Sequence, residues 1–270
     1  MNFQAYSDLR GVNWSTLREM GRSPAHYQHR LTTPRTDSPA MRLGRAIHTA
    51  VLEPDLFPVH WTLYDGRRAG NAWTEFATVN AAKGILTVDE YDTVLEIRDA
   101  VHRHKVARRL LRYGKSEVTL QWVDPVTRIK CRARLDHLRG NVLTDLKSTK
   151  DIDNRTFGRL AANMGYAGQL AFYRLGLLAT GHDLAPVRIV AVESTAPHDV
   201  AVFTVDEDVL EVGAMEVSKL LHQLKTCRRK RRWPGRYQEE ESLQYPEWAL
   251  ASDNDLSGLG IAFQTAGRTP

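Results

Sequence analysis

Apolar residues recur at helical spacing in several parts of the chain. Residues 40–53 carry their apolar side chains on one helical face, and Pro54 ends the pattern. Thr87 and Glu90 have the spacing of a capping box, which marks the start of another helix. Helices are therefore expected over residues 13–31 (interrupted at Ser23-Pro24), 40–53, 87–112, 157–180 and 206–226.

Shorter apolar runs bounded by turn residues predict strands. Gly140-Asn141 is typical of a two-residue hairpin turn, and Asp124-Pro125-Val126-Thr127 is expected to form the turn before it. Strands are expected over residues 117–123, 128–136, 142–147, 187–192 and 200–205. This order of elements predicts an α/β (α+β) fold, in which helices flank a sheet.

Two segments lack these patterns. Residues 55–82 are expected to form an irregular insertion, and residues 251–270 a loosely ordered C-terminal tail rich in Ser, Gly and Asp. The remainder, residues 1–250, is expected to form a single domain. A chain of 270 residues with 42% hydrophobic content can bury the core that one such domain needs.

The net charge, the cysteine content and the length of the apolar runs limit the classes of function that fit this chain. The net charge of +5 fits a nucleic-acid partner without requiring one. Cys131 and Cys227 form no zinc-type cluster, and two cysteines exclude a four-cysteine iron–sulfur site within one chain. No apolar run approaches the roughly 18 residues that span a bilayer, and the first residues do not resemble a signal peptide. A cytoplasmic protein without a membrane partner is expected.

The hairpin around Gly140-Asn141 holds the strongest candidate chemistry. With those residues at the turn, Arg139 faces Val142, and counting back places Asp136 opposite Asp145. Lys147, two residues beyond Asp145, points to the same side of the strand. Two opposed carboxylates repel each other, but a divalent cation between them reverses the sign, and Mg²⁺ prefers such oxygen ligands. Together with a lysine, this arrangement predicts a phosphodiester hydrolysis site.

The preceding hairpin is expected to add charged residues. If residues 124–127 form the turn, Glu117 pairs with Arg134 and Thr119 with Arg132, on the side of Asp136. The opposite, apolar face is expected to hold Cys131, Ala133, Leu135, Val142 and Leu146. The competing interpretation is that all these charges lie on an ordinary solvated strand face.

The same residues resemble the PD-(D/E)XK nuclease superfamily, whose motif is matched by Asp136 followed by Asp145-Leu146-Lys147. Residues 44–48 resemble the helix that places a histidine on the metal in the RecB-like branch, and residues 169–173 match the QxxxY motif of that branch. With residues 23–27, the set is most similar to phage and prophage RecE-type exonucleases (exodeoxyribonuclease VIII). The resemblance implies a restriction-endonuclease-like core with a central mixed sheet.

This resemblance implies a role for each matching position. His48, Asp136 and Asp145 would bind the metal together with the main-chain carbonyl of Leu146, and Lys147 would be the catalytic lysine. The implied cation is Mg²⁺, and a histidine ligand makes Mn²⁺ acceptable.

Further positions have weaker assignments. Glu117 would be an accessory catalytic acid near the metal, and Gln169 and Tyr173, four apart on one helix face, would hold DNA or the hairpin. Tyr166 lies on that face and is given no role. Three arginines are expected to contact DNA: Arg45, Arg132 and Arg134. The basic run Arg228–Arg232 is either a solvated helix end or a phosphate contact.

The expected function is a metal-dependent DNA exonuclease that degrades duplex ends from 5′ to 3′ in phage-type recombination. The similar enzymes act with a single-strand annealing protein and form rings. The resemblance implies that this chain has a possible annealing partner and a possible ring-shaped homo-oligomer. The alternatives are an endonuclease or single-strand nuclease, and a catalytically silent DNA-binding subunit. Retention of Asp136, Asp145 and Lys147 disfavours the silent subunit. Gly114-Lys115-Ser116 does not complete an ATP-binding loop, because Arg109 replaces its first glycine.

Overall fold

A computed structural model describes residues 6, 8–33, 37–183 and 186–246. The chain divides into two compact units, Met1–Arg236 and Tyr237–Pro270. Within the second unit, the described residues 237–246 form neither helix nor strand. The predicted tail over 251–270 lies outside the described residues, so the predicted domain limit at residue 250 stays a prediction.

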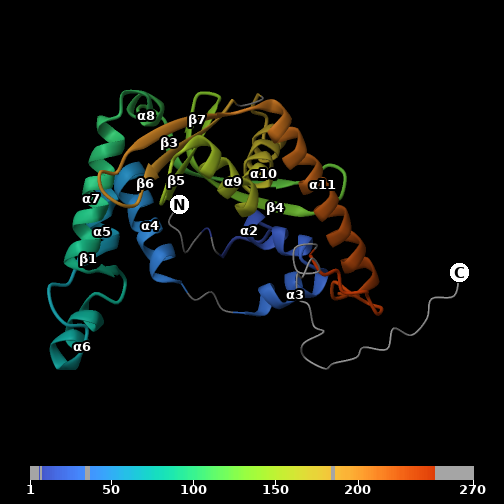
Figure 1. The fold of residues 1–270 in the computed structure, drawn as a ribbon, viewed down its shortest axis with the longest axis horizontal. Coiled ribbons are helices and arrows are strands. Elements are labelled where there is room, and N and C mark those ends of the chain that lie inside the picture. Colours follow the sequence, from blue (N-terminus) through green and yellow to red (C-terminus); the bar gives the residue numbers. More distant parts are fainter. Residues whose placement is uncertain (1–5, 7, 34–36, 184–185, 247–270) are drawn as a thin grey trace, which may run out of the picture. The chain divides into compact units, whose positions relative to one another are not determined.

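A mixed sheet organises the first unit (Figure 1). Its five strands lie in the order β3-β4-β5-β6-β7, with β5 and β6 parallel and the other neighbours antiparallel. The strands are β3 (Lys115–Val123), β4 (Lys130–Arg139), β5 (Val142–Thr149), β6 (Val187–Glu193) and β7 (Val200–Val205). This sheet confirms the predicted fold class and the predicted strands.

The parallel pair requires a crossover, which two helices provide between β5 and β6. α9 (Asn154–Met164) ends at Gly165, whose φ of +68° is the left-handed conformation that glycine adopts readily. α10 (Tyr166–Ala179) begins directly after it. The single helix predicted over 157–180 is therefore two helices, and the first of them starts at the N-cap Asp153.

One face of the sheet is covered by the crossover and by both ends of the unit. α10 lies against β3 and β4, and α11 (Glu207–Lys230) packs along α10 (Figure 1). A Cβ at Gly213 of α11 would lie 2.2 Å from the Ala167 carbonyl oxygen, so this close approach requires glycine. α2 (Trp14–Leu17), the 3₁₀ turn η1 (Arg18–Gly21) and α3 (Pro24–Thr32) complete the layer. We call this the first core; it includes Leu17, Tyr27, Leu135, Phe172 and Leu221.

The opposite face is covered by α4 (Pro39–Leu52), α7 (Val88–Arg103) and α8 (Lys105–Leu111). We call this the second core; it includes Ile47, Val51, Ile97, Leu146 and Val190. The sheet is thus buried on both faces, as is usual when parallel strands are present.

Two more predicted helical segments, 87–112 and 13–31, are also divided in the structure. The Thr87–Glu90 capping box is confirmed, but the helix ends at Arg103, where His104 caps a new helix through its imidazole Nδ1, which accepts from the Ala107 N–H. At the N-terminus, Ser23 caps α3, and Pro24 occupies its first turn.

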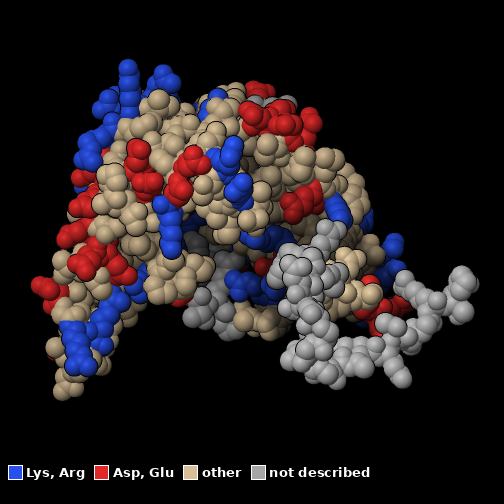
Figure 2. Space-filling model, in the orientation of Figure 1, with Lys and Arg blue, Asp and Glu red and all other residues tan. Residues whose placement is uncertain are grey.

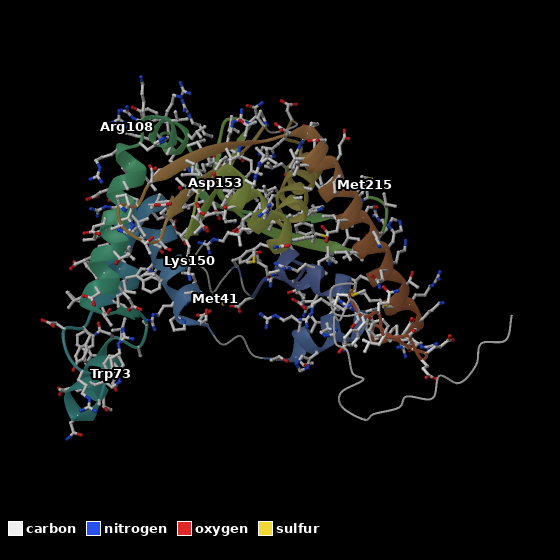
Figure 3. The ribbon with its side chains drawn as sticks, in the orientation of Figure 1. Met41, Trp73, Arg108, Lys150, Asp153 and Met215 are labelled. Atoms are coloured by element: carbon white, nitrogen blue, oxygen red, sulfur yellow. The ribbon has the colours of Figure 1, made fainter. Side chains whose placement is uncertain are left out.

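Residues 55–82 are not irregular, and that prediction is wrong. The segment forms η2 (Pro54–Leu56), α5 (Phe57–His60), β1 (Trp61–Leu63) and α6 (Gly70–Val79), and β1 pairs in parallel with β2 (Gly84–Leu86). Trp73, on α6, contacts Tyr64 at a ring-centroid distance of 5.1 Å and lies far from the sheet (Figure 3). The hydrophobic pattern did not indicate the helix α6, because none of its residues is buried. No helix formed by the described residues is both long and apolar enough to cross a bilayer.

Candidate metal centre

The centre lies where β4 and β5 stop pairing. The predicted register is confirmed for Arg139 with Val142, as it is for the next two pairs, and Gly140 takes the positive φ that the turn needs. The ladder ends there, one pair before Asp136 and Asp145. Asp136 Oδ2 instead accepts a hydrogen bond of 2.8 Å from the Leu146 N–H. At the two aspartates the main-chain ladder thus gives way to a contact made by the Asp136 side chain.

The register of β3 against β4 differs from the prediction by two residues. Thr119 faces Arg134, because the connection extends from Asp124 to Ile129 and has Arg128 at a φ of +64°. The Asp124 carboxylate accepts two hydrogen bonds of 2.6 Å from Thr127, which stabilise this wider turn. A shift of two keeps each residue on its side of the strand.

Glu117 therefore still lies beside Asp136, although not where the prediction placed it. Its φ of +52° is unusual within a strand, and the pairing of β3 with β4 skips from Ser116 to Val118. Its carboxylate forms an ion pair with Arg134, the residue predicted as its direct cross-strand partner.

The predicted division into a charged and an apolar face is wrong. Asp145 and Lys147 face Ile189 and Ala191 of β6, which belong to the first core. Leu146 belongs to the second core, whereas Cys131, Ala133 and Leu135 belong to the first. Both faces are covered, so Asp145 is 0% exposed and Asp136 only 9% exposed. These values contradict the interpretation of the acids as solvated surface charges.

Three of the predicted residues converge on one point. Ligand atoms of His48, Glu117 and Asp136 all lie within 4.8 Å of one another, and among the described residues they form the group that could hold a metal ion. His48 reaches the strands from α4, where the neighbouring Ala46 and Ile47 are buried against the sheet. Its Nδ1 lies 3.7 Å from Asp136 Oδ2.

Asp145 lies next to this group but has a different contact. Its Oδ2 is 2.5 Å from Lys147 Nζ, while its buried Oδ1 has no hydrogen-bond partner among the described residues. A buried carboxylate oxygen without a donor is costly unless a cation is bound. Such an oxygen beside three further ligand atoms fits a hard divalent cation.

Burial and a neighbouring carboxylate raise the pKa of two acids of the centre, Glu117 and Asp145. Burial, reinforced by Asp136, raises the pKa of Glu117 to about 7. Burial also raises the pKa of Asp145 to about 6, against the opposing effect of Lys147. For Lys147, burial alone would lower the pKa, but the carboxylates of Asp145 and Asp136 outweigh it and raise the pKa. The lysine therefore stays an ammonium, and the raised pKa values mean that Glu117 and Asp145 ionise less readily than exposed acids do.

Comparison with known proteins identifies the family. Residues 13–245 match the family described as a PDDEXK-like domain of unknown function (DUF3799). The chain belongs to this family. The PD-(D/E)XK resemblance of the sequence is thereby confirmed.

Several solved structures are similar to this chain. A Eubacterium rectale protein provisionally assigned as an exonuclease has 13% identity and a TM-score of 0.63, over 94% of this chain and 98% of that one. A phage-related exonuclease from Haemophilus somnus 129PT has 12% identity and a TM-score of 0.35, over 83% and 99% of the two chains. The first similarity shows a shared fold alone, and the second is too weak to support an argument. No curated protein compared with the chain matches it.

The QxxxY residues of this PDDEXK-like chain lie on α10, where Tyr173 is near the acids of the centre. Gln169 Nε2 donates to Tyr173 Oη at 2.8 Å. Burial raises the pKa of Tyr173 well above its usual value, and the nearby carboxylates of Asp145 and Asp136 add to this effect. The phenol therefore stays protonated, with its hydroxyl near the acids.

The three arginines predicted to contact DNA all have partners within the protein. Arg45 forms an ion pair with Asp37, and Arg134 with Glu117. Arg132 donates to the Tyr6 and Leu9 carbonyl oxygens, at 2.5 and 2.6 Å. Each arginine holds protein structure together, and its contact with DNA stays a prediction.

Tyr166 is the residue whose role the sequence did not reveal. Lys147 Nζ lies 4.7 Å from the centroid of its ring, a cation–π distance. The sequence feature that could have indicated this role is the position of Tyr166, about one helical turn before Gln169. Its position over the lysine depends on Gly165, whose left-handed conformation starts α10 at Tyr166.

Proposed function

We propose that this chain is a divalent-metal-dependent deoxyribonuclease. The observation that supports this most directly is the Lys147–Asp145 ion pair, buried beside His48, Glu117 and Asp136 at a break in the sheet. The carboxyls of Glu117 and Asp136 lie close together and near Asp145, and a cation bound between them would offset their repulsion. A buried ammonium next to them suits a substrate that brings its own negative charge, such as a phosphodiester.

His48, Glu117 and Asp136 would hold Mg²⁺, with Mn²⁺ accepted because of the imidazole. Asp145 and the main-chain carbonyl of Leu146 complete the proposed ligand set. A cation held there would supply Lewis-acid chemistry to a phosphodiester, that is, polarisation of a phosphoryl oxygen and a lower pKa for a bound water.

The chain's own residues orient the substrate. Lys147 is fixed between the Asp145 carboxylate and the Tyr166 ring, so that its ammonium can donate to a phosphate oxygen and to the attacking water. Gln169 and Tyr173 are hydrogen-bonded to each other, and the Tyr173 hydroxyl near Asp145 and Asp136 would be an uncharged donor for the substrate.

The order of the motifs supports a more specific proposal: an exonuclease that degrades duplex ends from 5′ to 3′ in phage-type recombination. The support is the similarity of the sequence to RecE-type enzymes, which also motivates a single-strand annealing partner and a ring-shaped assembly. Cleavage within a closed circle would instead favour an endonuclease.

Linear duplex DNA labelled at either the 5′ or the 3′ end tests both the metal-dependent nuclease activity and the 5′-to-3′ polarity. The purified chain is incubated with it in Mg²⁺, Mn²⁺ or EDTA, beside a closed circular duplex and the Lys147→Ala variant. Metal-dependent early release of the 5′ label, with an intact circle and an inactive variant, is expected. Early release of the 3′ label would overturn the polarity alone. DNA binding without cleavage in either metal would overturn the nuclease and favour a silent DNA-binding subunit.

A further inference from the structure

A second polar site lies at the other end of β4. A pocket of about 410 Å³ opens between the segment before α2, α3, the β3–β4 turn and the C-terminal end of α11. Ile129 and Tyr27 lie in its apolar floor, and Tyr27 is only 1% exposed. Tyr27 also stacks on Trp233 at 5.7 Å, which fixes the floor in place.

The wall formed by the N-terminal segment is built into the sheet edge. β5 pairs with β4 only near the hairpin turn, so the first residues of β4 have an open edge. Val12 occupies it: its N–H donates to the Lys130 carbonyl at 2.9 Å, and its carbonyl accepts from the Arg132 N–H at 2.8 Å. A Cβ on Gly11 would lie 3.1 Å from the Cys131 carbonyl carbon, so the segment lies tightly against the strand.

Cations without acidic partners converge on this pocket. Arg128, Lys130 and Arg228 are exposed and line it, and none of the described lining residues is acidic. Among the described residues, none of these three forms an ion pair, and Arg228 donates a 3.4 Å hydrogen bond to the neutral Tyr27 Oη. Asp124, in the adjoining turn, is already bonded to Thr127.

Three like charges over an apolar floor repel one another unless an anion compensates them. Lys and Arg side chains are also exposed along the lower part of α11 (Figure 2). Two arginines offer forked donors that match phosphate oxygens. The pocket volume far exceeds one phosphate group and leaves room for the attached sugars. These features favour a nucleic-acid backbone over a small free anion.

We infer that this pocket, defined by Arg128, Lys130 and Arg228, binds a backbone phosphate of the DNA strand whose end lies at the metal centre. Lys130 and Asp136 lie six residues apart on β4, which is roughly 20 Å at about 3.3 Å per residue. At about 3.4 Å per nucleotide, that distance corresponds to about six nucleotides. The anion site follows from the pocket alone, whereas the spacing rests on the proposed nuclease function.

Matched charge removals test the anion site. Binding of a fluorescent duplex is measured in EDTA, where no cleavage is expected, for wild type, Arg228→Gln, Lys130→Gln and Arg229→Gln. Arg229 is the next residue on α11, is exposed, and does not line the pocket. We expect Kd to rise about 5- to 10-fold for the pocket variants, with the salt slope of log K reduced by about one. Arg229→Gln should change Kd less than about twofold. Equal effects of Arg228→Gln and Arg229→Gln would overturn the site.

The position of the phosphate is tested with uncharged methylphosphonate linkages. Placed about five to seven nucleotides from the end, they should weaken wild-type binding but not weaken Arg228→Gln binding further. The same linkages about 15 nucleotides from the end should show no coupling to Arg228. Coupling that is equal at both places would overturn the spacing. If the chain binds DNA with these differences but never cleaves it, the anion site is supported and the nuclease proposal fails. If the chain cleaves DNA while the pocket variants bind DNA as Arg229→Gln does, the nuclease proposal is supported and the anion site is overturned.

Discussion

The single strand β4 contributes to two sites of opposite character. At one end, Asp136 belongs to a largely enclosed group with His48 and Glu117, in which burial raises the pKa of Glu117. At the other end, Lys130 belongs to an open pocket whose exposed cations lack acidic partners. Burial makes the difference, because a charge in the interior is worth far more than the same charge in water. We therefore expect large, all-or-none effects at the metal centre and graded, salt-dependent effects at the pocket.

Lys147→Ala should give the largest effect. Loss of the ammonium between Asp145 and the substrate phosphate should lower kcat by about 10³-fold or more. Lys150→Ala is the matched control: this exposed lysine follows β5 directly (Figure 3) and should retain kcat within about twofold. Comparable losses in both variants would show that general charge, not the buried site, drives cleavage.

Metal binding should stabilise the fold through the same acids. At a Mn²⁺ concentration about 100 times its Kd, binding adds about 2.7 kcal/mol, or roughly 5–10 °C in Tm. Asp136→Asn should abolish this shift, whereas Asp92→Asn, on the exposed side of α7, should keep it. Thermal unfolding with and without the ion measures both, and a shift preserved in Asp136→Asn would place the metal elsewhere.

Two acids should contribute stability to the metal-free protein that is lost as pH rises. The pKa of Glu117, raised to about 7, and that of Asp145, raised to about 6, lie above those of the unfolded chain, near 4. The folded state then binds more protons than the unfolded state, so its advantage is complete below about pH 4 and is lost as pH rises to about 7. Glu117→Gln should flatten this slope in urea unfolding measured across that range. A slope unchanged by the substitution would mean that Glu117 ionises normally.

Tyr166 should give the smallest effect at the metal centre. Tyr166→Phe keeps the ring over Lys147 and should leave kcat within about twofold, whereas Tyr166→Leu should lower it about 5- to 10-fold, the loss of a cation–π contact of about 1 kcal/mol. KM should change little in either variant. An equal loss in both variants would assign the effect to the hydroxyl instead.

The two hairpins show what local sequence can predict. Gly140-Asn141 selects one tight turn, so the register of β4 with β5 followed from the sequence. The turn before β4 has no such signal: its length depends on Arg128 in the left-handed conformation and on the Asp124 hydrogen bonds to Thr127. The register was therefore predicted two residues off, although its side-chain alternation was correct.

Burial at the site was less predictable than the identity of its residues. The motif spacing indicated His48, Asp136 and Lys147, but it could not show that helices cover both faces of the sheet. The ion pair of Arg134 with Glu117 and the contacts of Arg132 with the N-terminal segment are long-range consequences of packing. Residues that looked like DNA contacts in the sequence have structural partners as a result.

Anomalous diffraction from crystals of the wild-type chain soaked in Mn²⁺ tests the central claim most directly, because it needs no knowledge of the DNA substrate. The account predicts a manganese peak bound by His48, Glu117 and Asp136, beside the Asp145–Lys147 pair. No peak at saturating Mn²⁺, or a peak only at surface carboxylates away from β4, would contradict a metal centre at this break in the sheet.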